Sequence, residues 1–181
     1  MSSELKTNKI SPATGTALQI GDSGDTVDIP SGATFDVTGA TVTGLSAGKV
    51  LQVVQGTHAV AVSTTGTTYV TTGLSASITP SSSSNKVLVF GYINSFYAYG
   101  GPPAGGYISL YRGGSAIVTH SGWFYTVSSG AASVGMPFNH LDSPSSTSSL
   151  TYEVYFKRSH GTTVVVQDQG PSSITLMEIE A

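Results

Sequence analysis

The residues of this chain that could do chemistry are few, and one short motif stands out among them. Residues 21–25 read GDSGD, which resembles the sequence around the nucleophile of some serine proteases. That arrangement needs a histidine base and an aspartate placed upstream of the serine, and the first histidine here is His58. Glycine and aspartate also tolerate the left-handed backbone of tight turns. We therefore interpret residues 21–25 as a turn.

The histidines and carboxylates lack the spacing of a catalytic or metal site. No histidine lies in an HxH or HExxH pattern, so we interpret them as surface or hydrogen-bonded side chains; a metal held between copies around a symmetry axis is the alternative. Glycoside cleavage needs two acids about 5–10 Å apart, and no pattern in the sequence indicates such a pair. The sequence predicts no enzyme, no cofactor and no metal site. The histidines are His58, His120, His140 and His160.

Aromatic residues around one glycine-proline loop are the best candidates for ligand contact. The loop GGPPAGG spans residues 100–106, with aromatic residues on both sides of it. Flat aromatic faces beside a loop can stack on sugar rings, although strand alternation would turn half of them into the core. We predict a receptor contact, with a host surface glycan as the ligand class, at Tyr97, Tyr99, Tyr107 and Trp123.

Composition excludes several other partners. Only 9% of the 181 residues are charged, against roughly 25% in ordinary soluble domains. The seven Lys and Arg residues are scattered and the net charge is −3, so we expect no nucleic-acid partner. No apolar run approaches the roughly 18 residues of a membrane span, so we expect no membrane insertion. The polar start MSSELKTNK lacks a signal-peptide core, and the chain has no cysteine.

A short sequence repeat occupies residues 16–45, ahead of the longer β-rich part of the chain. Short apolar-polar-apolar units recur there, separated by glycine-rich turns, and their first positions are 18, 27, 35 and 42. Alternation within a unit indicates a strand, and the near-constant step indicates a repeat. The apolar positions are Leu18, Ile20, Val27, Ile29, Phe35, Val37 and Val42.

One chain cannot build a core from this repeat. Eight extended residues span at most roughly 26 Å, which closes into a ring only about 8 Å wide, whereas packed sheets need about 10 Å. Two repeats per coil would suffice, as in calcium-binding solenoids, but their GGxGxD-type signature is absent. We therefore predict an intertwined homotrimer in which each of three chains supplies one strand to every rung.

The chain divides into a polar arm at residues 1–13, the stalk at 14–48 and a β-rich head at 49–181. About ten alternating or apolar segments in the head, separated by turn signals, predict a β-sandwich or jelly roll. The longest, residues 86–99, should bend near Gly91. The predicted strands are residues 50–55, 59–63, 67–72, 74–79, 86–99, 106–111, 116–120, 123–127, 133–141, 150–157, 163–167 and 174–179. The predicted core is Val87, Val89, Ile93, Ile108, Leu110, Val154, Phe156, Val164, Val166, Ile174 and Leu176.

Four segments resemble the short tail-fibre and virion-fibre proteins of marine tailed bacteriophages. The resemblance extends over nearly the whole chain, and the segments that carry it read LKTNKISPATG (5–15), GDSGDTVDIPSGATFDVTGATVTGL (21–45), LDSPSSTSSLTYEVYFKRS (141–159) and SSITLMEIEA (172–181). The resemblance implies a homotrimer with an N-terminal virion anchor and a distal β-sandwich head. It leaves tail and capsid open as the place of attachment.

The sequence thus predicts an all-β protein, an N-terminal intertwined trimeric β-stalk followed by a β-sandwich or jelly-roll head. The function implied is a non-enzymatic, homotrimeric tail fibre of a phage virion, assembled in the host cytoplasm and contributing to host attachment. A capsid-decorating head fibre and a carbohydrate-binding module are the alternatives. The arm cannot fold alone, and we expect it to anchor the fibre to another virion protein through Leu5 and Ile10.

Overall fold

The computed structural model describes residues 10–12, 14–40, 49–120 and 132–181. The chain forms two units, Met1–Leu45 and Ser46–Ala181. The described residues contain ten strands and no helix, so the predicted all-β class is confirmed.

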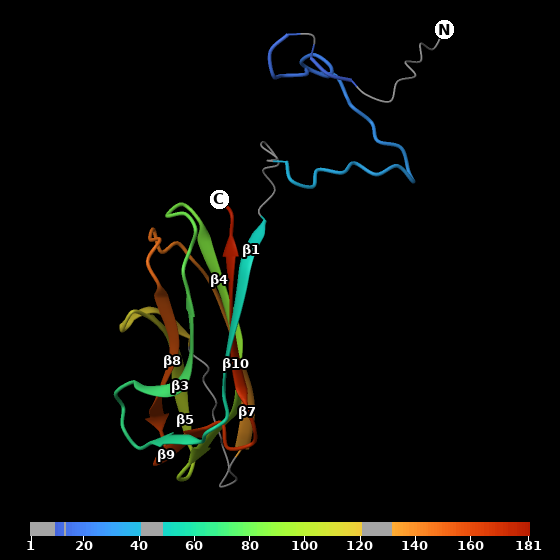
Figure 1. Ribbon diagram of the computed structural model, residues 1–181. Helices are drawn as coiled ribbons and strands as arrows, with labels where there is room; N and C mark the ends of the chain where they lie inside the picture. Colours follow the sequence, from blue (N-terminus) through green and yellow to red (C-terminus); the bar gives the residue numbers. More distant parts are fainter. Residues whose placement is uncertain (1–9, 13, 41–48, 121–131) are drawn as a thin grey trace. The chain divides into compact units, whose positions relative to one another are not determined.

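Two antiparallel sheets make up the second unit (Figure 1). The six-stranded sheet has the order β1-β10-β4-β9-β2, and β7 pairs with the other edge of β4. The four-stranded sheet has the order β3-β8-β5-β6. The strands of the first sheet are β1 (Val50–His58), β2 (Val62–Thr64), β4 (Lys86–Tyr99), β7 (Ala132–Asp142), β9 (Thr163–Val166) and β10 (Ser172–Ile179). Those of the second are β3 (Val70–Ile78), β5 (Gly105–Arg112), β6 (Ser115–His120) and β8 (Leu150–His160).

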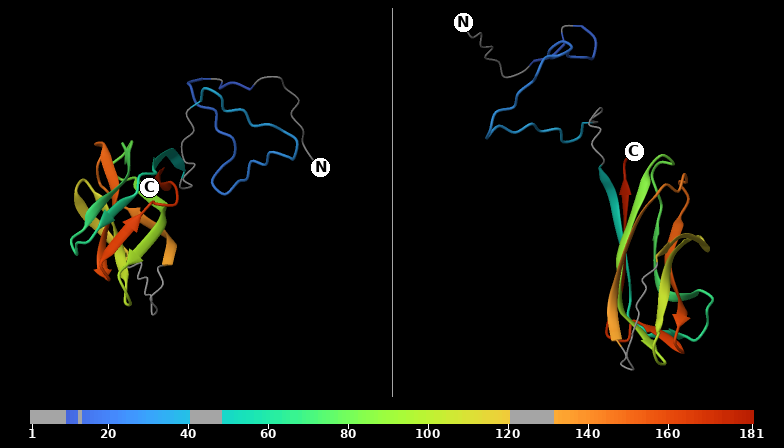
Figure 2. Two further views of the ribbon diagram at one scale, coloured as in Figure 1. Left: turned by 90° about the horizontal axis from the view of Figure 1, so that it is seen from below. Right: turned by 180° about the vertical axis from the view of Figure 1, so that it is seen from behind.

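The core fills the space between the two sheets, which lie face to face in both side views (Figures 1 and 2). Strand alternation directs every second side chain inward, as in β8, where Tyr152, Val154 and Phe156 are buried and the residues between them are half-buried. All eleven core residues predicted from the sequence are buried. The sandwich prediction is therefore confirmed at the level of two packed antiparallel sheets.

The long strand β4 is irregular at a different place from the one predicted. Gly91 stays in register with Ile174 and Phe138, and the register shifts between Ile93 and Phe96, where Ser95 has a φ of 55°. Glycine is needed at position 91 because a Cβ there would lie 2.3 Å from Ser173 O and 2.5 Å from the ring of Phe138. The pairing of β4 is thus regular at Gly91 itself, and the glycine makes room for a backbone carbonyl and an aromatic ring.

Two predicted strands, residues 67–72 and 74–79, are one strand in the structure. Gly73, which separates them in the sequence, lies inside β3 with a φ of 78°, at a shift of register between Thr71 and Ser75. A glycine in the left-handed region of a strand is a typical bulge. The predicted strand at 123–127 lies outside the described residues.

Turns, not strands, are the regular feature of residues 14–40. Three turns are closed by backbone hydrogen bonds, from Asp25 N to Asp22 O (3.0 Å), from Ala33 N to Pro30 O (3.0 Å) and from Ala40 N to Val37 O (2.9 Å). The third residue of each turn is a glycine with positive φ: Gly24 (97°), Gly32 (87°) and Gly39 (78°). These are type II turns, and the first contains GDSGD, as the sequence predicts. The short strands predicted around Leu18, Val27 and Phe35 are not formed by the single chain.

Candidate functional site

No metal-binding cluster is present among the residues that the structure describes. No group of three or more His, Asp or Glu side chains could hold a metal ion there. His58 has a structural role, because its Nδ1 lies 2.7 Å from the side-chain amide of Gln167. With its nitrogen toward His58, that amide also donates to Val60 O (2.8 Å) and Thr72 O (3.2 Å). His58 is thus a hydrogen-bonded structural residue.

A group of tyrosines covers the outer surface of the four-stranded sheet. The rings of Tyr111 and Tyr155 stack at 3.9 Å with an interplanar angle of 23°, and Tyr69 meets Tyr111 edge-on at 6.2 Å. The ammonium of Lys157 lies 4.6 Å from the ring centroid of Tyr69 and 5.5 Å from that of Tyr107. We call Tyr69, Tyr107, Tyr111, Tyr155 and Lys157 the tyrosine face.

Strand alternation and register bring these side chains together. Ile108 and Leu110 of β5 point into the core, so Tyr107 and Tyr111 point outward. In the neighbouring β8, Val154 and Phe156 point inward, which turns Tyr155 and Lys157 to the same outer surface. The register pairs Lys157 directly with Tyr107. Tyr69 comes from the segment just before β3.

The tyrosine face presents neutral hydroxyls, aromatic rings and one ammonium group. Burial raises the pKa of Tyr69, and burial together with the nearby Glu153 carboxylate raises the pKa of Tyr155. Both phenols therefore stay protonated at neutral pH. The hydroxyl oxygen of Tyr69 is itself buried, so the half-buried Tyr155 is the one of the two that keeps a proton to donate to a ligand. The Glu153 carboxylate accepts a hydrogen bond from the Thr71 hydroxyl. Such a surface suits a polar ligand with flat apolar faces, and a sugar ring has both features.

The structure does not bring the predicted receptor residues together. Tyr97 and Tyr99 lie on β4 of the six-stranded sheet, edge to face at 4.3 Å, and Tyr99 is 44% exposed. Tyr107 lies on the four-stranded sheet, in the tyrosine face. The two groups point outward from different layers, and Trp123 lies outside the described residues.

Sequence reasoning missed four members of the tyrosine face: Tyr69, Tyr111, Tyr155 and Lys157. The alternation LTYEVYFK at residues 150–157 does predict that Tyr152 and Tyr155 face opposite sides. Tyr111 alternates with a predicted core residue, Leu110, in the same way. The pairing of β5 with β8, which places these rings side by side, has no local signal in the sequence.

A second surface lies in the first unit, where the predicted stalk core is exposed. The side chains are between 39% and 73% exposed, and Val42 lies outside the described residues. Of the predicted anchor, Ile10 is 54% exposed and Leu5 lies outside the described residues. We call the six exposed stalk side chains the apolar ladder: Leu18, Ile20, Val27, Ile29, Phe35 and Val37.

Comparisons with known proteins give no family. No protein-family model matches the chain, and no curated protein matches it. Among solved structures, the chain is similar to part of dimeric latent PorU from Porphyromonas gingivalis, with 11% identity over 77% of this chain and 14% of that chain, at a TM-score of 0.39.

Two further similar structures are of infectious bursal disease virus. The Gx strain structure shows 18% identity over 78% of this chain and 36% of that chain (TM-score 0.41). The T=1 particles derived from the virus show 15% identity over 84% and 41% (TM-score 0.40). The chain thus spans less than half of each of these chains. Within the ranges described here, no helix is long and apolar enough to cross a membrane.

Proposed function

We propose that this protein is a homotrimeric fibre of a tailed-bacteriophage virion, assembled in the host cytoplasm, which contributes to host attachment. The observation that carries the proposal is the apolar ladder, a regular series of large apolar side chains that the described part of one chain leaves exposed. Large exposed apolar surfaces on soluble proteins usually mark an interaction site. Two further copies of the same chain would present apolar side chains at the same spacing, and they are therefore the partners that fit the apolar ladder.

The turns support this arrangement. They begin at Asp22, Pro30 and Val37, so the chain changes direction every seven or eight residues, once per unit of the ladder. That spacing suits a stalk in which each copy supplies one short segment per rung. In the trimer the ladder would turn inward, where burial of each large apolar side chain contributes about 1.5–3 kcal/mol.

The strand order supports a jelly-roll head. When the short strands β2 and β9 are set aside, the two sheets read β1-β10-β4-β7 and β3-β8-β5-β6. Each sheet thus combines early and late strands of the chain, as two interlocked Greek keys do. Jelly rolls occur in viral capsid and lectin domains alike, so function has to be argued from the surfaces rather than from the fold.

We assign host attachment to a glycan bound by aromatic side chains, with the tyrosine face as the first site and the Tyr97–Tyr99 pair as the second. The face combines ring surfaces with hydroxyl and ammonium donors, and an aromatic site with a few polar groups is typical of ligand binding. Trp123 belongs to the proposed contact through the sequence alone.

Two double variants of the full-length protein test these sites. Tyr111→Ala with Tyr155→Ala, at the first site, should lower binding to host cells or to arrayed glycans at least tenfold, and Tyr97→Ala with Tyr99→Ala, at the second site, should lower it less. Loss only in the second double variant would move the contact to the six-stranded sheet. Full binding by both double variants would remove the proposed receptor contact.

The arm at residues 1–13 is proposed to join the fibre to another virion protein through Leu5 and Ile10. Deletion of residues 1–13 should leave a folded trimer that no longer enters particles. Electron microscopy of particles labelled with an antibody to the head tests the location: label on the tail supports a tail fibre, and label on the shell indicates a capsid fibre. A protein that is never found on particles but binds glycans as a monomer would be a carbohydrate-binding module.

A further inference from the structure

An apolar row crosses the outer surface of the six-stranded sheet. The register pairs Val53 of β1 with Met177 of β10, Met177 with Leu88 of β4, and Leu88 with Leu141 of β7. These four side chains therefore lie side by side on four neighbouring strands. Val53 is 55% exposed and Leu141 is 50% exposed, and the two between them are half-buried.

More apolar side chains extend the row along the same surface. On one side Val50 lies opposite Ile179, and Leu51 follows Val50 at the register shift of β1. On the other side Phe90 and Tyr92 continue the outward positions of β4 and are both exposed. We call the row with these neighbours the apolar face: Val50, Leu51, Val53, Leu88, Phe90, Tyr92, Leu141, Met177 and Ile179.

The part of the opposite layer that lies outside the tyrosine face shows what a solvated surface of this sandwich looks like. The outward residues of β3 are Thr71, Ser75 and Ser77, and those of β8 include Thr151 and Glu153. An antiparallel sheet with one solvated side usually alternates apolar and polar residues in this way. The apolar face departs from that pattern over four adjacent strands, and a contiguous patch of this kind marks an interaction surface.

The position of the apolar face in the chain indicates its occupant. It begins at Val50, and only residues 41–49 separate it from the last described turn of the stalk segment. Nine extended residues span at most about 30 Å. Copies gathered through the apolar ladder would therefore hold their β1 strands within reach of one another, at an effective concentration in the millimolar range. At that concentration even a weak apolar contact between heads is occupied.

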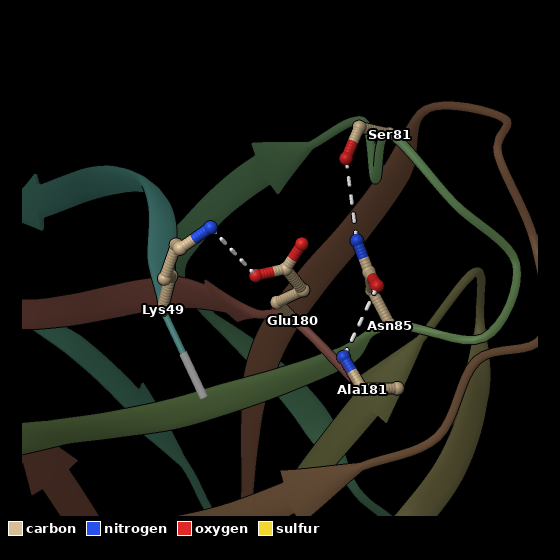
Figure 3. Close-up of polar contacts among 5 residues, drawn as sticks. All are labelled: Lys49, Ser81, Asn85, Glu180 and Ala181. Carbon is tan, nitrogen blue, oxygen red and sulfur yellow. Dashed lines mark hydrogen bonds and ion pairs between the residues drawn. The ribbon is translucent and has the colours of Figure 1, made fainter. Parts of the chain in front are cut away.

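The start of β1 is also held firmly to the sheet that carries this face (Figure 3). The backbone nitrogen of Glu180 donates to Lys49 O at 2.9 Å, and the Lys49 ammonium lies 3.5 Å from the Glu180 carboxylate. Asn85, at the start of β4, accepts a hydrogen bond from Ala181 N at 3.4 Å. The chain therefore enters the head at a fixed point beside the apolar face.

From these observations we infer that the apolar face packs against neighbouring copies of this chain, so that the trimer is joined through its heads as well as through its stalk. This inference rests on the proposed homotrimer. It adds a second interface, centred on Val53 and Leu141, and leaves the tyrosine face of the other layer exposed to ligands.

Single cysteines in the full-length protein test the head interface, because the natural chain has none. Val53→Cys lies in the apolar row, and Ser77→Cys is the matched control, exposed on the outer surface of β3. The measurements are the rate of labelling by a maleimide and the mass of the native assembly. We expect Val53→Cys to react at least tenfold more slowly than Ser77→Cys in the trimer, and Leu141→Lys combined with Val53→Cys to restore fast labelling.

The outcomes separate this inference from the function on which it rests. A trimeric mass with equally fast labelling at both positions would overturn the head interface and leave the stalk trimer standing. A monomeric mass, whatever the labelling rate, would overturn both. A trimeric mass with Val53→Cys protected and Ser77→Cys reactive supports the head interface.

Discussion

A buried carboxylate ties the last strand to the loop between β3 and β4. Glu178 has no exposed surface. One oxygen accepts hydrogen bonds from the backbone nitrogen and hydroxyl of Ser81, both at 2.7 Å, and from Asn85 Nδ2 at 2.6 Å. The other accepts from Gln52 Nε2 at 2.5 Å. Burial alone would raise the pKa of Glu178, but these hydrogen bonds outweigh it and lower the pKa to about 2.

This network gives a pH-dependent prediction for Glu178→Gln. Because the pKa in the folded state lies below the ordinary 4.5, the stabilisation is complete above about pH 4.5 and is lost as the pH falls toward 2. The variant should be less stable than wild type at pH 7 by about 1–3 kcal/mol, and the difference should shrink toward pH 2. Urea unfolding of both proteins at several pH values measures it.

Glu180→Gln is the matched control for that measurement. Its partner Lys49 is 3.5 Å away and both side chains are about half exposed, so the change should cost about 0–1 kcal/mol. A difference between wild type and Glu178→Gln that stays constant from pH 7 to pH 2 would contradict the account of Glu178.

A second residue-scale prediction concerns the hydroxyl of Tyr152. This ring is fully buried, and its hydroxyl donates to Asp142 Oδ2 at 2.6 Å beside the ion pair of Asp142 with Arg112. Burial and the hydrogen bond to Asp142 raise the pKa of Tyr152. Tyr152→Phe leaves Asp142 with one donor fewer and should destabilise the head by about 1–3 kcal/mol, measured by urea unfolding. Tyr99→Phe, at an exposed ring, should change stability by less than about 0.5 kcal/mol; equal losses in the two variants would refute the role of the hydroxyl.

At the scale of elements, a substitution in a turn of the stalk segment should change the stability of the trimer without changing the stability of the head. Gly32 has a φ of 87° and no atom within 4 Å of the place where a Cβ would be. Gly32→Ala therefore adds only backbone strain, about 1–2 kcal/mol per copy. We predict that the Gly32→Ala trimer dissociates at a higher protein concentration and at a lower temperature than the wild-type trimer. The melting temperature of the head should be unchanged.

Ser31→Ala is the control for this prediction, because it changes the neighbouring residue of the same turn without a demand for positive φ. Dissociation is followed by analytical ultracentrifugation and head melting by circular dichroism. A trimer of Gly32→Ala as resistant to dilution as that of Ser31→Ala would refute the role of these turns in assembly.

The elements also show what sequence pattern can and cannot predict. Alternation identified the buried side chains of β4, β5, β8, β9 and β10, because burial on one side of a strand is a local property. The roles of the glycines were harder to predict, because Gly73 and Gly91 both interrupt an apolar segment in the sequence. In the structure Gly73 forms a bulge, whereas Gly91 makes room for Phe138.

Features that depend on strand pairing were not predictable. The tyrosine face depends on the pairing of β5 with β8, and the apolar row depends on the pairings among four strands. Such partners are distant in sequence, and no local residue pattern specifies them. The predicted receptor set mixed residues of two layers for this reason, as Tyr99 and Tyr107 show.

At the scale of the whole molecule, the proposed fibre assigns a different task to each surface. The apolar ladder and the apolar face would bind copies of the chain, and the tyrosine face would bind a ligand. The low charge, 9% of residues, fits a protein whose contacts are apolar and aromatic rather than ionic.

The mass of the native full-length protein tests the central proposal most directly. Sedimentation equilibrium at low micromolar concentration should give three times the chain mass of 18.5 kDa, and Val27→Asp with Phe35→Asp should lower that mass while the head keeps its melting temperature. A wild-type mass of 18.5 kDa across the concentration range would contradict the homotrimeric fibre.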